Sequence, residues 1–370
     1  MAYEVTDEQR DLAHAVAELV AGESTPRASY DGGPPIDQKL WDHLISLGFV
    51  GLAVAEERGG GGATLFDEVL VAEQLGAGDA AVPYLAATVG ARVLDAVGAD
   101  ELLRRLLVDR QVVVAAVSAV DGVDPWATAV VEGGTGGSGR DVRPGRARLS
   151  GTALDLLEAA SADVLLVPAD VDGAIEWFAV EASDASLVDQ PSLDRAARAA
   201  AVHLDGVPAV RLGPLPEGTI EPLHVALVLC SAEATGAASK ALEASVAYAK
   251  QRKQFGHTIG SFQAIKHKLA DMLLLVENAR SATYHAAWSL DGLGEEPAVV
   301  ASLAKAVATG NAARVTGEAV QAHGAIAITW ELDIHLLLRR AKSCQLVLGS
   351  PDHHFDLLAA ALLDTPEVTA

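Results

Sequence analysis

The sequence predicts an α+β protein in which a β domain lies between two helical parts. Apolar residues recur at helical spacing in residues 1–108, and long helical patterns return in residues 223–370. Between them, residues 109–222 contain short β-branched runs separated by Gly, Pro, Asp and Ser. A chain of 370 residues is long enough for several domains. We therefore predict an N-terminal helical domain (1–108), a middle β domain (109–222) and a C-terminal helical bundle (223–370).

The first part opens with a helix signal at Thr6. A hydroxyl that can cap the helix is followed there by Asp7 and Glu8, whose negative charge suits the first turn. Further helices are expected around 40–47, 65–75 and 83–97. The glycine run 59–62 cannot continue a helix, and it lacks the strand and the Lys-Ser/Thr pair of a phosphate loop. We interpret it as a connector.

The middle part has the turn-separated runs of a mostly antiparallel sheet. A Gly-rich stretch, 132–139, separates two of these runs and predicts a turn or loop. The expected strands are 112–117, 129–131, 164–167, 175–180 and 201–204.

The last part is helical in long segments. Residues 262–279 place their apolar side chains on one face of a helix, and another helix is expected to begin at Pro297. Ser350 followed by Pro351 is typical of an N-cap with proline in the first helical position.

The charge balance excludes one broad class of partner. There are 27 Lys and Arg residues against 50 Asp and Glu, giving a net charge of −23, and only 4% of residues are aromatic. Such a chain would repel a phosphate backbone and offers few rings for base stacking, so no nucleic-acid partner is expected.

Membrane insertion, secretion and metal binding are not expected either. The uninterrupted apolar runs are shorter than the roughly 18–20 residues of a membrane span, and the acidic start does not resemble a signal peptide. Cys230 and Cys344 are too few for a disulfide framework. His353 and His354 are adjacent, so they point in different directions on a helix and make a poor metal pair. We expect a cytoplasmic protein without a metal.

Three segments resemble signatures of the acyl-CoA dehydrogenase family. Residues 248–272 (YAKQRKQFGHTIGSFQAIKHKLADM) match its most specific motif, residues 321–331 (QAHGAIAITWE) match its Gln-x-x-Gly-Gly-x-Gly-x-Thr-x-Glu segment, and residues 54–62 match its Glu-Glu-x-Gly-Gly loop more weakly. The resemblance implies an N-terminal helical domain, a middle β-barrel-like domain and a C-terminal four-helix bundle. It also implies FAD at the boundaries of a dimer or tetramer.

The resemblance assigns cofactor roles to five residues. Arg252 would hold the FAD pyrophosphate of a neighbouring subunit, for which a guanidinium is suited because it donates two parallel hydrogen bonds. Phe255 would pack near the cofactor, and Gly256 would let the backbone turn closely. Gln321 and Gly324 would lie along the adenosine end of the same FAD. The alternative for Arg252 is an ordinary salt bridge at a helix end.

The family's catalytic base is absent from both positions where it would be expected. Removal of the α-proton of an acyl-CoA requires a carboxylate in a water-poor site. One family position for this glutamate corresponds to Leu348, in the segment after Arg339-Arg-Ala-Lys. The other corresponds to Ala226. Neither residue is a carboxylate, so the sequence predicts no catalytic residue.

The middle part departs from the family as well. The segments that would contact the flavin ring correspond to 115–124 and 148–157, and neither carries the family's pattern. The chain therefore resembles the non-catalytic partner in α2β2 bacterial acyl-CoA dehydrogenases, several of which act on steroid side-chain CoA esters. This implies FAD at a heteromeric interface and a second subunit that carries the glutamate.

Two alternatives remain open. The chain could be a self-sufficient, homo-oligomeric acyl-CoA dehydrogenase with a displaced base, for which Glu233 and Glu331 are the nearest candidates. It could also be a structural homologue that binds no flavin. The sequence leaves open whether a fatty acyl or a steroid side chain is oxidised, and whether the assembly is a dimer or a tetramer.

Overall fold

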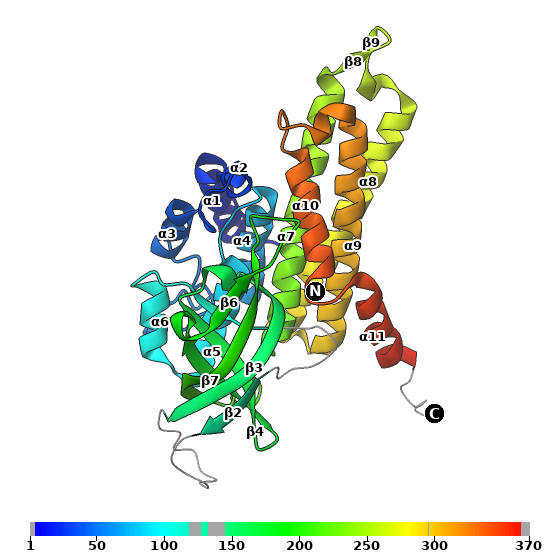
Figure 1. Cartoon of the computed structure of the whole chain (residues 1–370). Helices are drawn as coiled ribbons and strands as arrows, with labels where there is room; N and C mark the ends of the chain where they lie inside the picture. Colours follow the sequence, from blue (N-terminus) through cyan, green and yellow to red (C-terminus); the bar gives the residue numbers. More distant parts are fainter. Residues whose placement is uncertain (1–3, 118–126, 132–144, 295, 364–370) are drawn as a thin grey trace, which may run out of the picture. The chain divides into compact units, whose positions relative to one another are not determined.

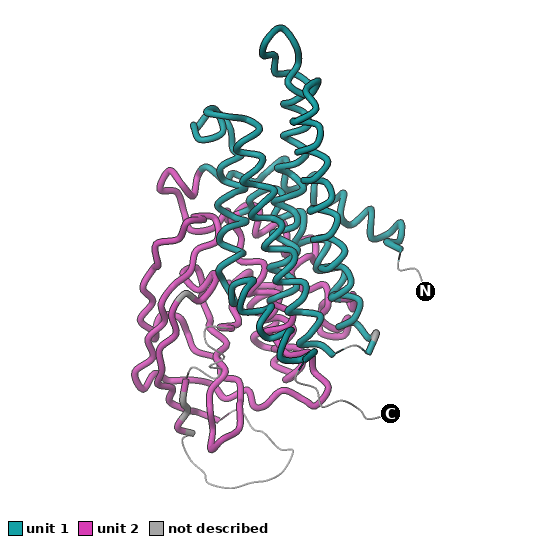
Figure 2. Tube along the Cα trace, turned by 90° about the vertical axis from the view of Figure 1, so that its right-hand side faces the viewer, with its two compact units in different colours: residues 1–27, 65–80, 227–370 teal, residues 28–64, 81–226 magenta. Residues whose placement is uncertain are grey.

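The computed structural model describes residues 4–117, 127–131, 145–294 and 296–363. The chain forms two compact units, drawn in different colours in Figure 2. Unit 1 comprises residues 1–27, 65–80 and 227–370, and unit 2 comprises 28–64 and 81–226. The division into domains 1–108, 109–222 and 223–370 stays a prediction.

Unit 1 begins with the helix expected at Thr6. Helix α1 spans Asp7–Glu23. The Thr6 hydroxyl accepts from the Gln9 amide at 3.2 Å, and the Gln9 side chain accepts from the Thr6 amide at 3.1 Å. This reciprocal capping box satisfies two amide donors that a helix start leaves without partners.

The C-terminal part of unit 1 is the expected helical bundle. Its long helices stand side by side in Figure 1, and a short hairpin of β8 and β9 joins α7 to α8. Ser350 caps α11 as predicted, because its hydroxyl accepts from the His353 amide at 3.3 Å. The helices are α7 (Pro222–Gln251), α8 (Gln263–Trp288), α9 (Pro297–His323), α10 (Ile334–Leu346) and α11 (Pro351–Leu363).

Two glycines let helix α4 (Leu65–Ala77) pack closely against α7. A Cβ atom at Gly236 would lie 1.8 Å from the backbone oxygen of Glu73, and one at Gly76 would lie 2.1 Å from the backbone oxygen of Glu233. Distances this short are incompatible with any side chain. Each helix therefore supplies the glycine that accommodates the other's backbone, and the two backbones are in direct contact.

By length and composition, helix α7 is long and apolar enough to cross a membrane, although its uninterrupted apolar runs are short. Its most apolar window has a mean hydropathy of 1.3, and 83% of that window is buried inside the protein. The helix is rich in Ala, and four of these alanines (Ala232, Ala234, Ala237 and Ala238) are fully buried. Its apolar character is therefore explained by packing against other helices.

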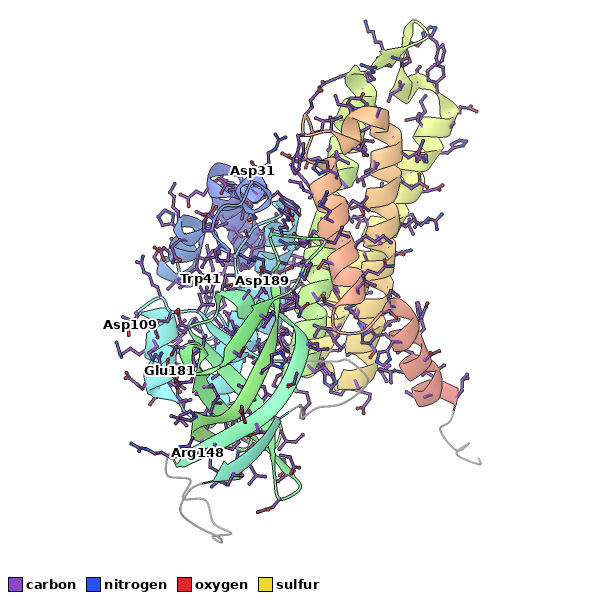
Figure 3. All side chains as sticks on the ribbon, in the orientation of Figure 1. Asp31, Trp41, Asp109, Arg148, Glu181 and Asp189 are labelled. Atoms are coloured by element: carbon purple, nitrogen blue, oxygen red, sulfur yellow. The ribbon has the colours of Figure 1, made fainter. Side chains whose placement is uncertain are left out.

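Unit 2 combines short helices with the middle sheet. Trp41 of α3 is fully buried and is labelled in Figure 3. In the same unit, Arg105 of α6 donates two hydrogen bonds to Glu181, at 2.6 and 2.8 Å. The helices are α2 (Pro26–Tyr30), α3 (Gln38–Ser46), η1 (Glu56–Arg58), α5 (Tyr84–Val97) and α6 (Asp100–Leu107).

The sheet of unit 2 closes on itself, in agreement with the β-barrel-like domain that the resemblance implies. Its order is β1-β4-β2-β3-β7-β5, and β5 also pairs with β4, so five strands form a ring. Pairing is antiparallel except between β4 and its neighbours β1 and β2. The strands are β1 (Val113–Ala115), β2 (Ala127–Val131), β3 (Arg146–Leu157), β4 (Val164–Val171), β5 (Ala174–Glu181), β6 (Ser186–Asp189) and β7 (Ala199–Gly213). The Gly-rich segment 132–139 lies outside the described residues.

Candidate functional site

The hairpin between α7 and α8 carries the most specific sequence motif. Strand β8 (Lys253–Gln254) pairs with β9 (His257–Thr258), and Phe255 and Gly256 form the two-residue turn. Their φ angles are +52° and +81°. Positive φ at both positions is the geometry of a type I′ turn, which Gly adopts readily and Phe does not. The turn therefore holds Phe255 in an unfavourable backbone conformation.

The Phe255 side chain projects into solvent. It is 89% exposed, although large aromatic side chains are normally at least partly buried. Its one aromatic neighbour among the described residues is Phe262, which meets it edge-on with the ring centroids 6.4 Å apart. Figure 1 shows the hairpin beyond the ends of the α7 and α8 helices. A strained, exposed aromatic residue at a protruding turn is typical of a contact surface.

Arg252 follows the last residue of α7. Its amide donates to Tyr248 at 2.8 Å, and its carbonyl accepts from the Ile259 amide at 2.8 Å, so its backbone is fixed between the helix and the hairpin. The side chain is exposed, and its guanidinium forms no ion pair or hydrogen bond with any residue that the structure describes. The alternative of a helix-end salt bridge is therefore not realised within the described part of the chain.

The second motif lies at the same end of the bundle as the first. The ring of Tyr248, near the end of α7, stacks on His323, the last residue of α9, with centroids 4.5 Å apart and an interplanar angle of 27°. The His323 Nδ1–H donates to the Ala319 carbonyl at 2.8 Å. This stack brings Gln321 and Gly324, which flank His323, to the end of the bundle where α7 leads into Arg252.

Gly324 is required by its backbone conformation. Its φ and ψ angles are +70° and −150°, a region that essentially only glycine occupies. A Cβ atom there would meet nothing within 4 Å, so the requirement comes from the torsion angles rather than from crowding. Gln321 is exposed on the last turn of α9.

Leu348 occupies the first family position for the base, in the loop between α10 and α11. It is 7% exposed, and its φ is +55°, followed by +91° at Gly349. Two buried side chains hold the loop. The Lys305 ammonium donates to the Gly349 carbonyl at 2.8 Å, and His354 Nε2–H donates to the Leu348 carbonyl at 2.8 Å. The loop is thus held through hydrogen bonds to its backbone carbonyls, while the side chain at position 348 is apolar.

Burial changes the acid–base properties of both holding residues. Burial lowers the pKa of His354 to about 4, so the imidazole is neutral at pH 7 and its Nδ1 accepts from the Ser302 hydroxyl at 3.2 Å. Burial also lowers the pKa of Lys305, which is fully shielded from solvent. Sequence analysis considered His354 only as part of a metal pair and did not single out Lys305, although a lysine within the small apolar run 299–308 is a usable signal.

Ala226, the second family position, is buried near the start of α7. In the middle part, the segment 148–157 belongs to β3, whereas residues 118–124 of the segment 115–124 lie outside the described residues. Glu158, which follows β3, is buried and accepts from the Ala86 amide at 2.8 Å, at the start of α5. This carboxylate is thereby placed at a helix N-terminus.

Glu233, one candidate for a displaced base, belongs to a buried ionic cluster of unit 1. Its Oε2 lies 3.1 Å from Nη1 of Arg340, whose Nε lies 3.4 Å from Oδ1 of Asp79. Arg340 also donates to the Ala80 carbonyl at 2.9 Å. Breaking such a buried pair leaves an uncompensated charge, so the Glu233 carboxylate is committed to its partner.

The other candidate, Glu331, is exposed, and its amide lies 3.4 Å from the Thr329 hydroxyl. A carboxylate in water lacks the environment that raises its basicity.

No cluster of three or more metal-ligating side chains occurs among the described residues. The imidazole of His354 is engaged by the Ser302 hydroxyl and the Leu348 carbonyl.

An acyl-CoA dehydrogenase fold is defined by the combination of a helical N-terminal part, a closed mixed sheet and a C-terminal helical bundle. Residues 6–109 match the acyl-CoA dehydrogenase N-terminal domain, and residues 219–363 match the acyl-CoA dehydrogenase C-terminal domain. The chain is 31% identical over 360 residues to acyl-CoA dehydrogenase IpdE2 of Mycolicibacterium smegmatis, covering 96% of this chain and 99% of that protein. The chain belongs to the acyl-CoA dehydrogenase family, whose members are FAD-dependent oxidoreductases that act on acyl-CoA thioesters.

Two solved structures of paired proteins are similar over nearly the whole chain. The Tcur3481–Tcur3483 steroid acyl-CoA dehydrogenase variant superimposes with a TM-score of 0.85 at 26% identity, covering 98% of this chain and 99% of that one. The ChsE4–ChsE5 complex from Mycobacterium tuberculosis gives a TM-score of 0.85 at 26% identity, covering 99% of this chain and 100% of that one.

Proposed function

We propose that this chain is the non-catalytic subunit of a heteromeric α2β2 acyl-CoA dehydrogenase. It would complete the FAD site of a partner subunit that carries the catalytic glutamate. The reaction of the complex would be α,β-oxidation of an acyl-CoA thioester to the 2-enoyl-CoA. One observation carries the proposal. The side chains assigned to the FAD of a neighbouring subunit are present and exposed at Arg252 and Phe255. The two positions for the catalytic glutamate, Leu348 and Ala226, are instead apolar and buried.

The residues at the end of the bundle fit a flavin dinucleotide. The exposed Arg252 guanidinium, free of protein partners among the described residues, can donate two parallel hydrogen bonds to a pyrophosphate. Phe255 presents an exposed ring from a turn that fixes its direction. Gln321 and Gly324 are held on the same end by the Tyr248–His323 stack. These residues would hold the adenosine diphosphate part of FAD.

In the complex, bound FAD supplies the acceptor for the β-hydride of the acyl group. This chain's own contribution is binding and orientation: Arg252 neutralises the pyrophosphate charge, and Phe255 excludes water beside it. Leu348 cannot accept the α-proton, and the neutral His354 behind it is occupied by the Ser302 hydroxyl and the Leu348 carbonyl. The proton acceptor must therefore come from the partner.

The relatives support a paired assembly and suggest a substrate class. Both similar solved structures are named as pairs of proteins, and one of them is named a steroid acyl-CoA dehydrogenase. A steroid side-chain CoA ester is accordingly the first substrate to test, with a fatty acyl-CoA as the comparison. Of the two alternatives, a displaced base is disfavoured by the ion pair that engages Glu233 and by the exposure of Glu331.

The test is co-expression with a candidate partner that carries the family glutamate. We expect the purified complex to be yellow, with one FAD for each pair of unlike subunits, and to oxidise an acyl-CoA. This chain alone should be inactive. Turnover by the chain alone at the rate of the complex would contradict the proposal, and a colourless complex would favour the flavin-free homologue.

Substitution of Arg252 tests the cofactor role directly. R252Q should lower the FAD content of the complex, and R252K should retain more of it because one charge remains without the bidentate geometry. The matched control is R10Q, since Arg10 is also an exposed arginine but lies in α1 and pairs with Asp7. If R252Q and R10Q retained FAD equally, Arg252 would not be a pyrophosphate ligand.

A further inference from the structure

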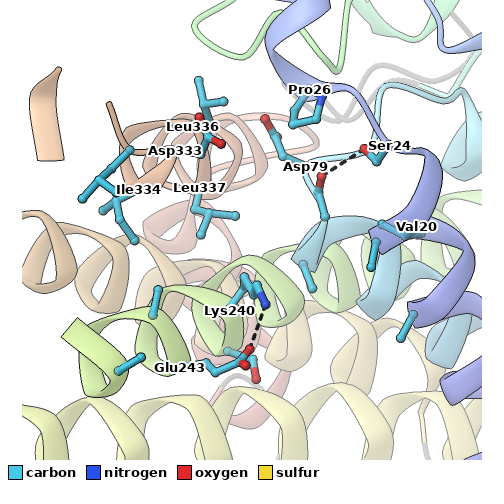
Figure 4. A pocket seen from close by; sticks show the side chains of 18 of the residues that line it. Val20, Ser24, Pro26, Asp79, Lys240, Glu243, Asp333, Ile334, Leu336 and Leu337 are labelled. Atoms are coloured by element: carbon cyan, nitrogen blue, oxygen red, sulfur yellow. Dashed lines mark hydrogen bonds and ion pairs between the residues drawn. The ribbon is translucent and has the colours of Figure 1, made fainter. Parts of the chain in front are cut away.

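Unit 1 contains a cavity that none of the proposed roles uses. Its volume is about 840 Å³, within the range of pockets that bind small molecules. The walls come from α1, α4, α7 and the start of α10, and Figure 4 shows their side chains around the open space. Neither Leu348 nor Ala226 lines it.

Small and apolar side chains make up most of the walls. Helix α1 contributes Ala21 and Val20, and α7 contributes Ala244 and Ala247. Leu336 and Leu337 of α10 also line the space, on the other side of it from Val20 in Figure 4. The alanines leave room that larger residues would fill, and the aliphatic groups provide no hydrogen bonds. A ligand here would be held mainly by burial of apolar surface.

Each acidic or basic side chain that lines the cavity is already paired. Lys240 and Glu243 lie 3.0 Å apart, and Asp333 accepts from Arg27 at 2.6 Å. Asp79 is paired with the buried Arg340 at 3.4 Å. The first two pairs are partly exposed to solvent, whereas Asp79 is buried. A charged ligand would find no unpaired opposite charge in these walls. The cavity is therefore suited to a neutral molecule.

Ser24, Gln74 and Ser239 add single hydrogen-bonding groups to the walls, and the largest group of such side chains lies at one end. Tyr248, His323 and Gln251 line the cavity where α7 and α9 end, and the first two are joined by their ring stack. At the other end the lining begins at Ser239. Twelve residues of helix at about 1.5 Å each separate Ser239 from Gln251, so the cavity follows α7 for roughly 18 Å.

We propose that this cavity is a binding site for a neutral, elongated, mainly hydrocarbon molecule with one hydroxyl or carbonyl group. The hydrocarbon part lies along the alanines of α1 and α7, and the polar group is directed to the end formed by Tyr248, His323 and Gln251. The site shares Tyr248 and His323 with the stack that holds Gln321 and Gly324, but its walls come from this chain's own helices, so binding there requires neither FAD nor a partner subunit.

The test uses two probes that differ in charge alone: 1-decanol and decanoate, titrated calorimetrically into the full-length protein at pH 8. We expect 1-decanol to bind with a Kd at least ten times lower than that of decanoate. Substitutions A247F and A21F add a ring to the lining from two different helices, α7 and α1, and each should weaken 1-decanol binding at least tenfold. The control A359F adds the same ring on exposed α11 and should leave the Kd unchanged.

Circular dichroism of each variant identifies any that fails to fold, and the two filling variants are independent of one another. Equal affinity for the two probes, a preference for decanoate, or no binding of 1-decanol up to its solubility limit would overturn the proposal. Binding that A247F and A21F leave unchanged would overturn it too. Because the titration needs no flavin and no partner, its failure would leave the proposed function untouched.

Discussion

The phenol ring of Tyr248 lies 4.5 Å from the imidazole of His323 and nearly parallel to it. This contact joins the last turn of α7 to the last residue of α9. One helix continues into Arg252 and the hairpin, and the other into Gly324. Two motifs that are far apart in the sequence are therefore held together by a single pair of rings.

Removing the stack should loosen both segments. Y248L is expected to lower the free energy of unfolding by roughly 0.5–1.5 kcal/mol, the usual contribution of an aromatic pair, whereas Y248F keeps the ring. In the complex, Y248L should also lower FAD content more than Y248F. Urea denaturation and flavin absorbance measure the two effects. If both variants behaved alike, the ring stack would not couple the segments.

A substitution at Phe255 should change the stability of the chain and the FAD content of the complex in opposite directions. Asn tolerates the left-handed backbone conformation far better than Phe, so F255N should raise the stability of the chain by about 1 kcal/mol. The same change removes the exposed ring and should lower the FAD content of the complex. Thermal unfolding and cofactor content are the measurements. Unchanged FAD retention would show that the ring does not contact the cofactor.

Gly310 inside α9 and Gly324 directly after it should respond oppositely to alanine. G324A places a Cβ in a glycine-only conformation and should cost about 1–3 kcal/mol. G310A lies inside the helix with no atom within 4 Å of the new Cβ, so it should stabilise by roughly 0.5–1 kcal/mol. Chemical denaturation compares them. Stabilisation by both would mean that the Gly324 backbone is not constrained.

Installing a carboxylate at position 348 should not create an enzyme from this chain. L348E would bury a carboxylate among apolar groups, next to the Gly349 carbonyl that Lys305 binds. This should lower the free energy of unfolding by at least about 2 kcal/mol. L348M, with the same backbone strain, should cost less than about 1.5 kcal/mol. Denaturation midpoints and acyl-CoA oxidation are measured on the chain alone. Activity in L348E would reveal a complete flavin site within one chain.

His354 should make the fold sensitive to mild acid. Its folded-state pKa of about 4 lies below the roughly 6.5 of an unfolded histidine, so the unfolded chain takes up the proton first as the pH falls. Stability from this group is complete above about pH 6.5 and is lost between there and about pH 4. The difference in unfolding free energy between wild type and H354N should therefore shrink across that window. A constant difference would contradict the assignment.

Local signals carried much of the fold. The Thr6 cap and the Ser350–Pro351 helix start depend on residues within a few positions of each other, and the structure has both. The two motif segments could be recognised from the sequence, but the contact that holds them together could not. The Tyr248–His323 contact depends on how α7 and α9 pack, which no local pattern specifies.

Non-local features were harder to predict. The parallel pairing of β4 with β1 and β2 closes the sheet, yet strand patterns specify neither partner nor direction. Lys305 would ordinarily be assigned to the surface, and only the Gly349 carbonyl explains its burial. Position 348 could be identified as apolar from the sequence, whereas its left-handed backbone conformation and the two side chains that fix it could not.

The direct backbone contact between α4 and α7 limits how this protein can be divided. A fragment beginning at residue 223 would contain the long helices but not α4, and would expose the backbone groove at Gly236 together with the Arg340 guanidinium, which needs Asp79 and the Ala80 carbonyl. The bundle therefore cannot be cut out as one continuous stretch of chain. Residues 65–80 have to accompany it, so α4 has to wait for a partner helix, α7, that is synthesised long after it.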